Sequence, residues 1–399
     1  MKRWLIIAMA AMLLLAACTG ADGPAGPAGA DGAPGPAGPA GPAGPAGADG
    51  EAAAGVFAAE YVGMATCAGC HSEIAEKVAL SGHPFKLNKV VDGQPPEYPF
   101  TEVVDVPDGY TWDDITYVIG GYNWKARFIG QDGFIITGDA DSATQYNFVN
   151  EDIGLGGDWV PYHPGEEKPY NCGPCHTTGY QAEGNQDGLP GMIGTWAEDG
   201  ITCEECHGPG SLHVQAPYGV EMKVDRTAAA CGDCHRRGAV EAIDASGGLV
   251  KHHEQYEEFF QSKHRALDCV ACHDPHAGVI AGRETDTATV RVECDSCHFE
   301  KAEEQKSEIM AQFLDCIDCH MPRLVKSAVG DAAAFTGDIR THLWAIDPNA
   351  VSQFSEDGST AISQVSLDFA CKWCHRDGGT ASVKTDQELI DEANGYHSP

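Results

Sequence analysis

The chain is poor in basic side chains. Of its 399 residues, 25 are Lys or Arg and 59 are Asp or Glu, so the formal net charge is −34. Such a surface repels the phosphates of nucleic acids and anionic lipid headgroups, which bind proteins through Lys and Arg. The composition therefore argues strongly against a nucleic-acid-binding role.

Long apolar runs are also missing, because charged residues occur throughout the chain, and this argues against a bundle of transmembrane helices. The one short apolar run, residues 4–15, follows Lys2 and Arg3 and has the build of a secretory signal. It ends in Leu-Ala-Ala-Cys18, which resembles the lipobox of bacterial lipoproteins. The resemblance implies removal of residues 1–17 and lipidation of Cys18. Thr19, not Asp, comes next, so nothing signals retention at the inner membrane. A plain signal peptide with an accidental cysteine is the alternative.

Residues 18–55 have no composition from which a core could form. Glycine recurs at every third position from Gly20 to Gly50, with Pro and Ala between, which is the Gly-X-Y pattern of collagen. Two interpretations stand: a semi-rigid polyproline-II spacer or a trimerising triple helix. Either one holds the following domain, residues 56–399, away from a membrane.

No thiol is left over, although the number of cysteines, 17, is odd. Beyond Cys18, the cysteines form eight Cys-x-x-Cys pairs, and histidine follows each pair directly. The motifs are Cys67/Cys70/His71, Cys172/Cys175/His176, Cys203/Cys206/His207, Cys231/Cys234/His235, Cys269/Cys272/His273, Cys294/Cys297/His298, Cys316/Cys319/His320 and Cys371/Cys374/His375.

This spacing is typical of covalent haem attachment. Two thiols on one helical turn form thioethers with the two vinyl groups of a haem, and the adjacent imidazole ligates the iron. A zinc knuckle or a redox dithiol would not require histidine after every pair. The sequence predicts eight haem c groups, each with its iron on a motif histidine.

Histidine is scarce outside the motifs. Nine of the 17 histidines remain for eight irons, which favours bis-histidine coordination, with methionine ligation as the alternative. Of the adjacent His252 and His253, we expect His252 to be the spare, because a helix over residues 253–264 places it off the face shared by His253 and His264. The predicted sixth ligands are His83, His163, His213, His253, His264, His276, His342 and His397. His397 either ligates within its own chain, ligates a haem of an adjacent subunit, or leaves one haem with an open site.

The predicted fold is mainly short helices and loops wrapped around a chain of haems, which would replace a conventional core. A small β element is expected near residues 100–140, from Tyr117, residues 124–129 and residues 134–137, with a turn at Asp132-Gly133. A second helix is expected over residues 300–314.

Several segments resemble known multihaem cytochromes. Tyr61-Val62-Gly63, the first motif and Ser81-Gly82-His83 resemble the tetrahaem cytochromes that partner hydroxylamine oxidoreductase, and residues 203–213 are similar to that wider superfamily. Residues 170–180 and 120–125 resemble multihaem cytochromes of metal-reducing bacteria. The resemblance implies parallel and perpendicular haem pairs, with His83, His213, His264 and His276 as distal ligands.

The leading functional hypothesis is an electron-transfer conduit, not an enzyme, exported and anchored at the outer membrane on its periplasmic or cell-surface face. Its partners would be other redox proteins or extracellular electron acceptors. One alternative is an octahaem oxidoreductase for a nitrogen or sulfur oxyanion with one open-site haem. The other is a subunit of an extracellular cytochrome filament. A homotrimer through the stalk or a homopolymer would accompany some of these functions.

Overall fold

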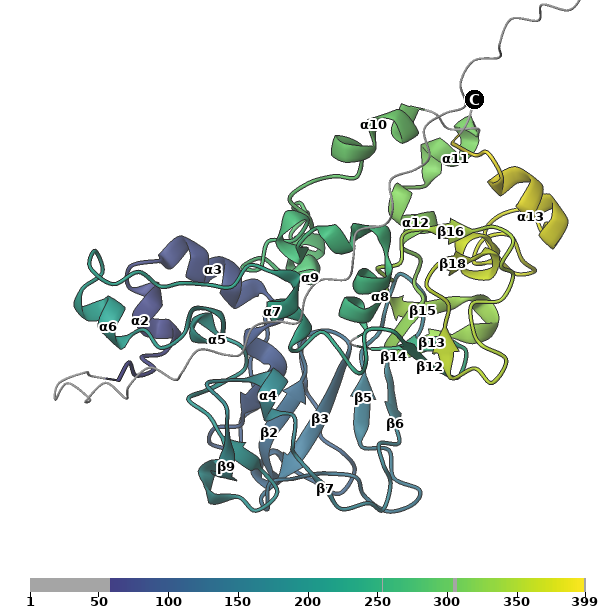
Figure 1. The fold of residues 1–399 in the computed structure, drawn as a ribbon. Coiled ribbons are helices and arrows are strands. Elements are labelled where there is room, and N and C mark those ends of the chain that lie inside the picture. Colours follow the sequence, from purple (N-terminus) through teal and green to yellow (C-terminus); the bar gives the residue numbers. More distant parts are fainter. Residues whose placement is uncertain (1–57, 253, 304–306, 398–399) are drawn as a thin grey trace, which may run out of the picture. The chain divides into compact units, whose positions relative to one another are not determined.

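Two larger β-sheets and a series of short helices make up the part of the chain that the computed structural model describes, residues 58–252, 254–303 and 307–397 (Figure 1). The expected signal peptide, Cys18 and the collagen-like segment lie outside the described residues. Among the residues that are described, no helix is both long and apolar enough to cross a bilayer.

The first sheet has seven strands, all paired antiparallel, in the order β1-β2-β3-β4-β7, with β5 paired to β3 and β6. Figure 1 shows β2, β3, β5 and β6 side by side. The strands are β1 (Leu87–Lys89), β2 (Ile115–Gly120), β3 (Lys125–Gly130), β4 (Phe134–Ile135), β5 (Gln145–Asn147), β6 (Asp158–Val160) and β7 (Lys168–Pro169).

The second sheet has five strands in the order β15-β14-β13-β12-β17, and only the β13–β14 pair is parallel. Its strands are β12 (Ile243–Ser246), β13 (Leu249–Lys251), β14 (Val325–Asp331), β15 (Thr336–Ile339) and β17 (Thr360–Ala361). Three two-stranded pairs complete the β structure: β8 (Thr177–Thr178) with β11 (Glu198–Asp199), β9 (Gln181–Asn185) with β10 (Ile193–Thr195), and β16 (Ile346–Asp347) with β18 (Val365–Ser366).

The helices are short, and most motif cysteines lie on them or at their ends. They are α2 (Met64–Ala68), α3 (Ser72–Leu80), α4 (Gly173–His176), α5 (Cys203–His207), α6 (Ser211–Gln215), α7 (Ala228–Gly232), α8 (Gln255–Gln261), α9 (Val279–Glu284), α10 (Asp295–Glu303), α11 (Glu308–Phe313), α12 (Cys316–His320) and α13 (Asp386–Ala393). The fifth motif begins on a 3₁₀ turn, Cys269–Ala271, and the eighth on a π turn, Asp368–Lys372.

The prediction of a small β element near residues 100–140 is corrected in extent. The two predicted central strands exist as β2 and β3, but they belong to the seven-stranded sheet, and a second sheet follows later in the chain. Strands of two or three residues, such as β4, β5 and β7, are too short to show an alternating apolar pattern, so the sequence did not reveal them.

Apolar cores exist in addition to any haem packing, which corrects the expectation that haems alone replace a core. Tyr117, Ile119 and Ile129 belong to one buried cluster, whereas Val118 and Phe128 belong to another, because successive side chains on β2 and β3 point to opposite faces. A third cluster lies at the second sheet, around Val250, Val325 and Leu343. Burying each such side chain contributes about 1.5–3 kcal/mol.

The two predicted helices are each shorter than expected. The helix predicted over 253–264 is α8, which ends at Gln261 because Ser262 is extended; the side chain of Ser262 then accepts from the amide of His264 at 3.0 Å. The helix predicted over 300–314 is divided between α10 and α11, and residues 304–306 between them are outside the described part.

Asp338 provides a test of how the second sheet is stabilised. Its carboxylate is 2% exposed and accepts hydrogen bonds from the amides of Ser327 (2.6 Å), Ala328 (2.7 Å) and Val329 (2.9 Å). Asp338→Ala would leave three buried donors unsatisfied, so we expect a loss of about 2–4 kcal/mol in unfolding free energy, measured by denaturant titration. Asp331→Ala, which removes only the exposed cap of a 3₁₀ turn, is the control and should cost about 1 kcal/mol. Equal losses for the two variants would contradict this assignment.

Candidate haem sites

The structure brings six motif histidines against six histidines from outside the motifs. In every pair the centres of the two imidazole rings lie 5.9–6.4 Å apart. The pairs are His71 with His213 (6.4 Å), His235 with His83 (6.3 Å), His207 with His276 (6.3 Å), His298 with His264 (6.0 Å), His273 with His342 (6.1 Å) and His320 with His397 (5.9 Å).

These distances fit an iron between the two rings. A ring nitrogen that ligates a metal lies about 2.0 Å from it, so two imidazoles on opposite sides of one ion have their centres roughly 6 Å apart. Ordinary contact would bring unligated imidazoles closer than this. The residues present therefore suit a bis-histidine haem at each of the six positions.

Hydrogen bonds fix the required tautomer in several of these rings. The Nδ1 atoms of His213, His320 and His397 lie 2.7, 2.7 and 3.0 Å from the carbonyl oxygens of Val220, Trp344 and Lys301. A donor at Nδ1 leaves the Nε2 lone pair available to a metal.

Burial keeps other rings of these pairs neutral, as ligation requires. Desolvation lowers the pKa of His83 to about 3, that of His235 to about 4 and that of His342 to about 3. An imidazole that does not protonate at neutral pH remains able to ligate iron.

The other predicted distal ligands are placed differently. His163 lies at the surface, where its Nδ1 is 3.0 Å from Glu166 Oε2 and its ring contacts Tyr162. His253 is outside the described residues. His252, the predicted spare, is bonded through its carbonyl oxygen to Arg237 Nη2 at 3.0 Å. His397 meets His320 of the same chain, which is the intrachain alternative.

Motif segments distant in sequence also lie against one another. Cys175 Sγ is 3.8 Å from the carbonyl oxygen of Asp233, and Cys234 Sγ is 3.9 Å from that of Pro174, so the second and fourth motifs face each other reciprocally. Cys67 lies near Cys203, and Cys231 near Cys269, close enough for each thiol to affect the pKa of the other. Haems attached at motifs that face each other would be close neighbours. The order of the haems in space would then differ from the order of their motifs in the sequence.

Three predicted attachment cysteines, Cys70, Cys297 and Cys374, differ from these in their surroundings. Cys70 and Cys297 are exposed and Cys374 is half-buried. Within the described ranges, no hydrogen-bond partner is seen for any of the three sulfurs. The physical reason is that a thioether-linked porphyrin lies directly on its own cysteines and would itself cover their sulfurs.

The backbone at these three cysteines nevertheless forms the single turn that was predicted for each motif. The amide of the second cysteine of each motif donates to the carbonyl oxygen of the first, so both thiols lie on one turn: Cys70 to Cys67 (3.1 Å), Cys297 to Cys294 (3.2 Å) and Cys374 to Cys371 (3.2 Å). One turn is the spacing that suits the two vinyl groups of a haem. Local geometry alone therefore supports attachment at Cys70, Cys297 and Cys374, which stays a prediction.

Two motif histidines, His176 and His375, are not in an imidazole pair of this spacing among the described residues. Burial and the nearby charges of Lys125, Arg237, Arg127 and His176 lower the pKa of His252 to about 3, so the ring of His252 lies near His176. His375 Nδ1 lies 2.8 Å from the carbonyl oxygen of Ser382, so its Nε2 is oriented as in the paired rings. His176 is different in its surroundings. Burial and the charges of Lys86, Arg127 and Lys125 lower its pKa to about 3.

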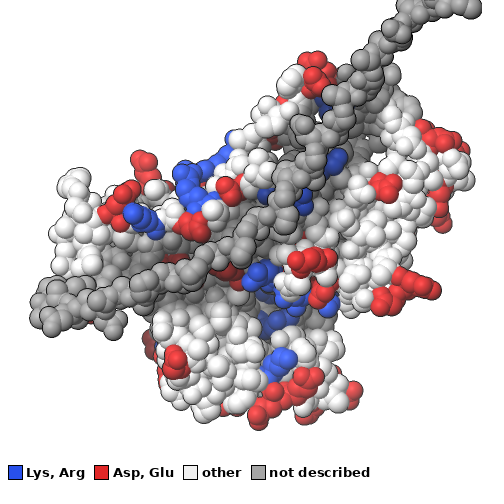
Figure 2. Space-filling view, viewed as in Figure 1, with Lys and Arg blue, Asp and Glu red and all other residues white. Residues whose placement is uncertain are grey.

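Basic side chains, rare in this chain, therefore gather around His176. Figure 2 shows several blue Lys and Arg side chains across the middle of the face drawn, with red acidic side chains both beside them and at the edges. Lys125 and Arg127 project from the same face of β3, because they are two residues apart on a strand. Desolvation, together with repulsion by the positive charge of neighbouring Arg127, lowers the pKa of Lys125 to about 7.

Neither of these two cations forms an ion pair within the described residues. Lys125 Nζ donates to the carbonyl oxygen of Ser327, and Arg127 Nε donates to Gln145 Oε1 at 2.6 Å. The guanidinium of Arg127 lies 3.8 Å above the ring of Tyr162. Asp338 is the carboxylate that acts on Lys125, but its oxygens already accept three backbone amides. Uncompensated, half-buried cations of this kind suit an anion.

Sequence reasoning missed this cluster. Lys125 and Arg127 alternate with apolar Ala126 and Phe128, which predicts a strand with two basic residues on one face. In a chain of net charge −34 this alternation was a usable signal, but nothing in the sequence connected it to the second motif.

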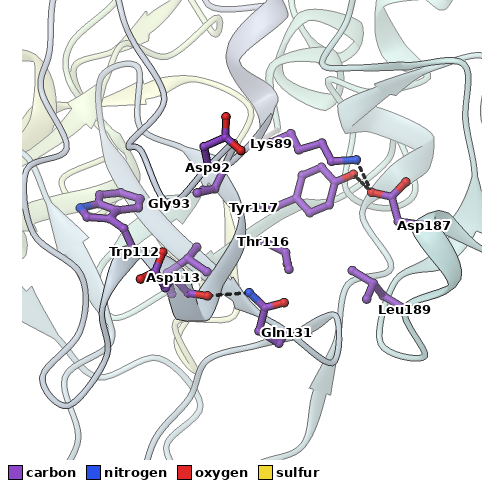
Figure 3. A pocket seen from close by; sticks show the side chains of 12 residues that line it. Lys89, Asp92, Gly93, Trp112, Asp113, Thr116, Tyr117, Gln131, Asp187 and Leu189 are labelled. Atoms are coloured by element: carbon purple, nitrogen blue, oxygen red, sulfur yellow. Dashed lines mark hydrogen bonds and ion pairs between the residues drawn. The ribbon is translucent and has the colours of Figure 1, made fainter.

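A separate hollow of about 310 Å³ lies at the edge of the first sheet (Figure 3). There Asp187 Oδ2 accepts from Lys89 Nζ and from the hydroxyl of Tyr117, both at 2.6 Å. On the other side, Gln131 Nε2 donates to the carbonyl oxygen of Asp113 at 2.8 Å. These polar groups satisfy one another, so the hollow differs from the cluster at His176, where the charges are uncompensated.

The comparisons with known proteins agree with this geometry. The family model described as cytochrome c554 and c-prime matches residues 160–208, which carry the second and third motifs. The dissimilatory sulfite reductase MccA of Wolinella succinogenes is 24% identical over 207 residues, or 41% of this chain and 28% of that protein. This chain therefore covers less than a third of the length of that relative.

Two solved structures are similar over most of the chain. The outer cell wall cytochrome OcwA has a TM-score of 0.51 and 19% identity, covering 83% of this chain and 86% of that one. The octahaem sulfite reductase MccA of Wolinella succinogenes has a TM-score of 0.53 and 18% identity, covering 86% of this chain and 68% of that one. The chain has the fold of a multihaem cytochrome c. Haem c is accordingly its cofactor, and the motif residues are those that fit its attachment.

Replacing His397 tests the pairing with His320 in this multihaem cytochrome. We expect His397→Ala to convert one haem from low-spin to high-spin, because its iron loses the second imidazole, as seen by electron paramagnetic resonance of the ferric protein. His163→Ala, which alters an exposed histidine, should leave every spin state unchanged. An effect that depended on protein concentration would show instead that His397 serves another subunit.

Proposed function

We propose that this multihaem cytochrome carries electrons along a series of haems to the haem at Cys172 and Cys175, where a small oxyanion is reduced. The observation that supports this most is the pair of cations, Lys125 and Arg127, which have no ion-pair partner among the described residues and lie beside the motif histidine His176. The conduit favoured by the sequence is retained as the supply of electrons. The oxidoreductase alternative is what the surroundings of His176 favour.

Eight haems are proposed, one at each motif, and six of them are bis-histidine. Bis-histidine haems have no open position, so they suit electron transfer and not substrate binding. The facing of the second and fourth motifs makes the His235 haem the neighbour that passes electrons to the His176 haem.

Residues of this chain would bind and orient the substrate. When bound, haem supplies the electrons at its iron. Arg127 presents a planar fork of donors that matches two oxygens of one anion, and Lys125 provides a point charge. Tyr162 covers one face of the Arg127 guanidinium and so restricts the directions from which an anion is bound. Together they compensate the general repulsion of anions by this acidic protein.

A sulfur oxyanion, sulfite first, is the proposed substrate, because one protein, the sulfite reductase MccA of Wolinella succinogenes, matches this chain both in sequence and in its solved structure. A nitrogen oxyanion or hydroxylamine is the second candidate. We also propose export and attachment to the outer membrane through Cys18, with residues 18–55 as spacer or trimerising stalk. The similarity to an outer cell wall cytochrome supports export. A filament is less favoured, because His397 meets a histidine of its own chain.

Reoxidation of the reduced protein tests the proposed activity. Sulfite, nitrite or hydroxylamine is mixed with the anaerobic, fully reduced protein, and haem absorbance is followed. We expect at least one of them to reoxidise it, and Arg127→Met to lower kcat/KM by roughly tenfold to a hundredfold, because one charged hydrogen-bond donor is lost. Lys89→Met, in the separate hollow, should leave the rate unchanged. Reoxidation by none of the three, together with no high-spin or cyanide-binding haem in the ferric protein, would leave a conduit only.

The pKa of Lys125 predicts how anion binding depends on pH. Desolvation lowers this pKa to about 7, so the ammonium is charged below about pH 7 and loses its charge as the pH rises through that value. Nitrite keeps one charge throughout this range. We therefore expect its affinity, titrated by haem absorbance, to fall between about pH 6 and about pH 8. Lys125→Gln should bind more weakly at low pH and flatten this part of the profile. An identical slope in both proteins would contradict the assignment to Lys125.

A further inference from the structure

Two buried amides on the neighbouring strand lie opposite the two cations beside His176, and one of these amides binds Arg127. In the antiparallel pairing of β3 with β5, Lys125 stands opposite Asn147 and Arg127 opposite Gln145. Side chains directly opposite one another point to the same face of a sheet. Gln145 is 7% and Asn147 4% exposed, so both amides are buried on the face that carries the cations.

These side chains form a continuous series of hydrogen bonds. Arg127 Nε donates to Gln145 Oε1 at 2.6 Å, and Gln145 Nε2 donates to Asn147 Oδ1 at 2.7 Å. Asn147 Nδ2 then lies 3.4 Å from the carbonyl oxygen of Ala328 on β14. The preceding carbonyl oxygen on β14, that of Ser327, accepts from Lys125 Nζ. Both cations are therefore connected, directly or through amides, to consecutive carbonyl groups of strand β14.

The direction of this series is fixed by chemistry. A guanidinium has donors only, so the oxygen of Gln145 must face Arg127 and its NH₂ group must donate onward. Asn147 then has its oxygen toward Gln145 and its NH₂ group toward Ala328. Reversing either amide would place two donors against each other, so Arg127 is held in one orientation.

Amides also hold the cations without cancelling their charge. Elsewhere, half-buried arginines have carboxylate partners: Arg237 Nε lies 3.1 Å from Glu254, and Arg323 pairs with Asp152. A carboxylate at position 145 would pair with Arg127, and one at position 147 would lie opposite Lys125; either would compete with an incoming anion. Two neutral amides leave both positive charges available.

We propose that Gln145 and Asn147 are positioning residues of the anion site: they orient Arg127 and, being neutral, place no carboxylate opposite Arg127 or Lys125, so that the site prefers a doubly charged oxyanion with at least two oxygens to a singly charged one. The inference rests on the proposed function, since it concerns the same cations. Neither amide is assigned contact with the substrate.

A charge series at position 145 tests the proposal in the full haem-loaded protein. Gln145→Glu adds a carboxylate without changing shape, so we expect KM for sulfite to rise about tenfold or more, with a smaller change in kcat. The ferric haem titrated with sulfite should show the same loss of affinity, and nitrite a smaller one. Gln145→Leu, which releases Arg127 but adds no charge, should raise KM and lower kcat together.

Two further variants separate a positioning role from a structural one. Asn147→Asp places the new carboxylate one step from Arg127, and we expect a rise in KM between those of wild type and Gln145→Glu. Asn185→Asp is the matched control, because Asn185 donates to the carbonyl oxygens of Pro190 and Met192, away from the cations, and its KM should stay unchanged. Haem absorbance per protein and far-ultraviolet circular dichroism identify misfolded variants.

The outcomes distinguish the two proposals. A wild-type protein that neither binds nor reduces an anion overturns the proposed function. An active wild type whose KM for sulfite is unchanged in both Gln145→Glu and Asn147→Asp overturns only the positioning role, as does an equal loss for sulfite and nitrite in Gln145→Glu. If Gln145→Glu fails to take up haem, the folded Asn147→Asp variant decides.

Discussion

The spacing of paired imidazoles is the constraint on which the rest of the molecule depends. Each pair joins segments that are distant in sequence, such as His71 with His213 and His83 with His235. A shared iron at such a position would act as a cross-link with strict geometry, which explains how short helices can be held in place with few interhelical apolar contacts. The apolar clusters are correspondingly concentrated in the two sheets, where backbone pairing already defines the positions of side chains.

In the proposed function the sheets have a second role, because β3 carries the two cations of the proposed anion site. A strand exposes alternate residues on one face, and β3 uses this to place Lys125 and Arg127 together while Ala126 and Phe128 pack in the core. A loop could not hold two desolvated cations so closely without a counterion. Rigid antiparallel pairing with β5 supplies the fixed positions that this arrangement requires.

The features of the structure that depend on residues close together in the sequence were the most predictable. The motif spacing indicated the cofactor class, and counting histidines indicated six partners that the structure does bring to motif histidines. His163 was indistinguishable from these in the sequence, because only the tertiary fold shows that it lies beside Glu166 at the surface. The sheets were underestimated because strands such as β5 have three residues. The cation cluster was missed because it depends on the contact between β3 and the second motif, which no local pattern encodes.

The pairing of His320 with His397 has a consequence for biogenesis. In the proposed export, which starts from the N-terminus, His397 would follow all sixteen motif cysteines across the membrane. Cofactor attachment at Cys316 and Cys319 would require only the nearby motif, whereas completion of this site would require a residue that comes after every motif. Formation of the His320–His397 site would therefore show that every other motif had already been exported. A chain that ended before His397 would lack the second histidine for that iron.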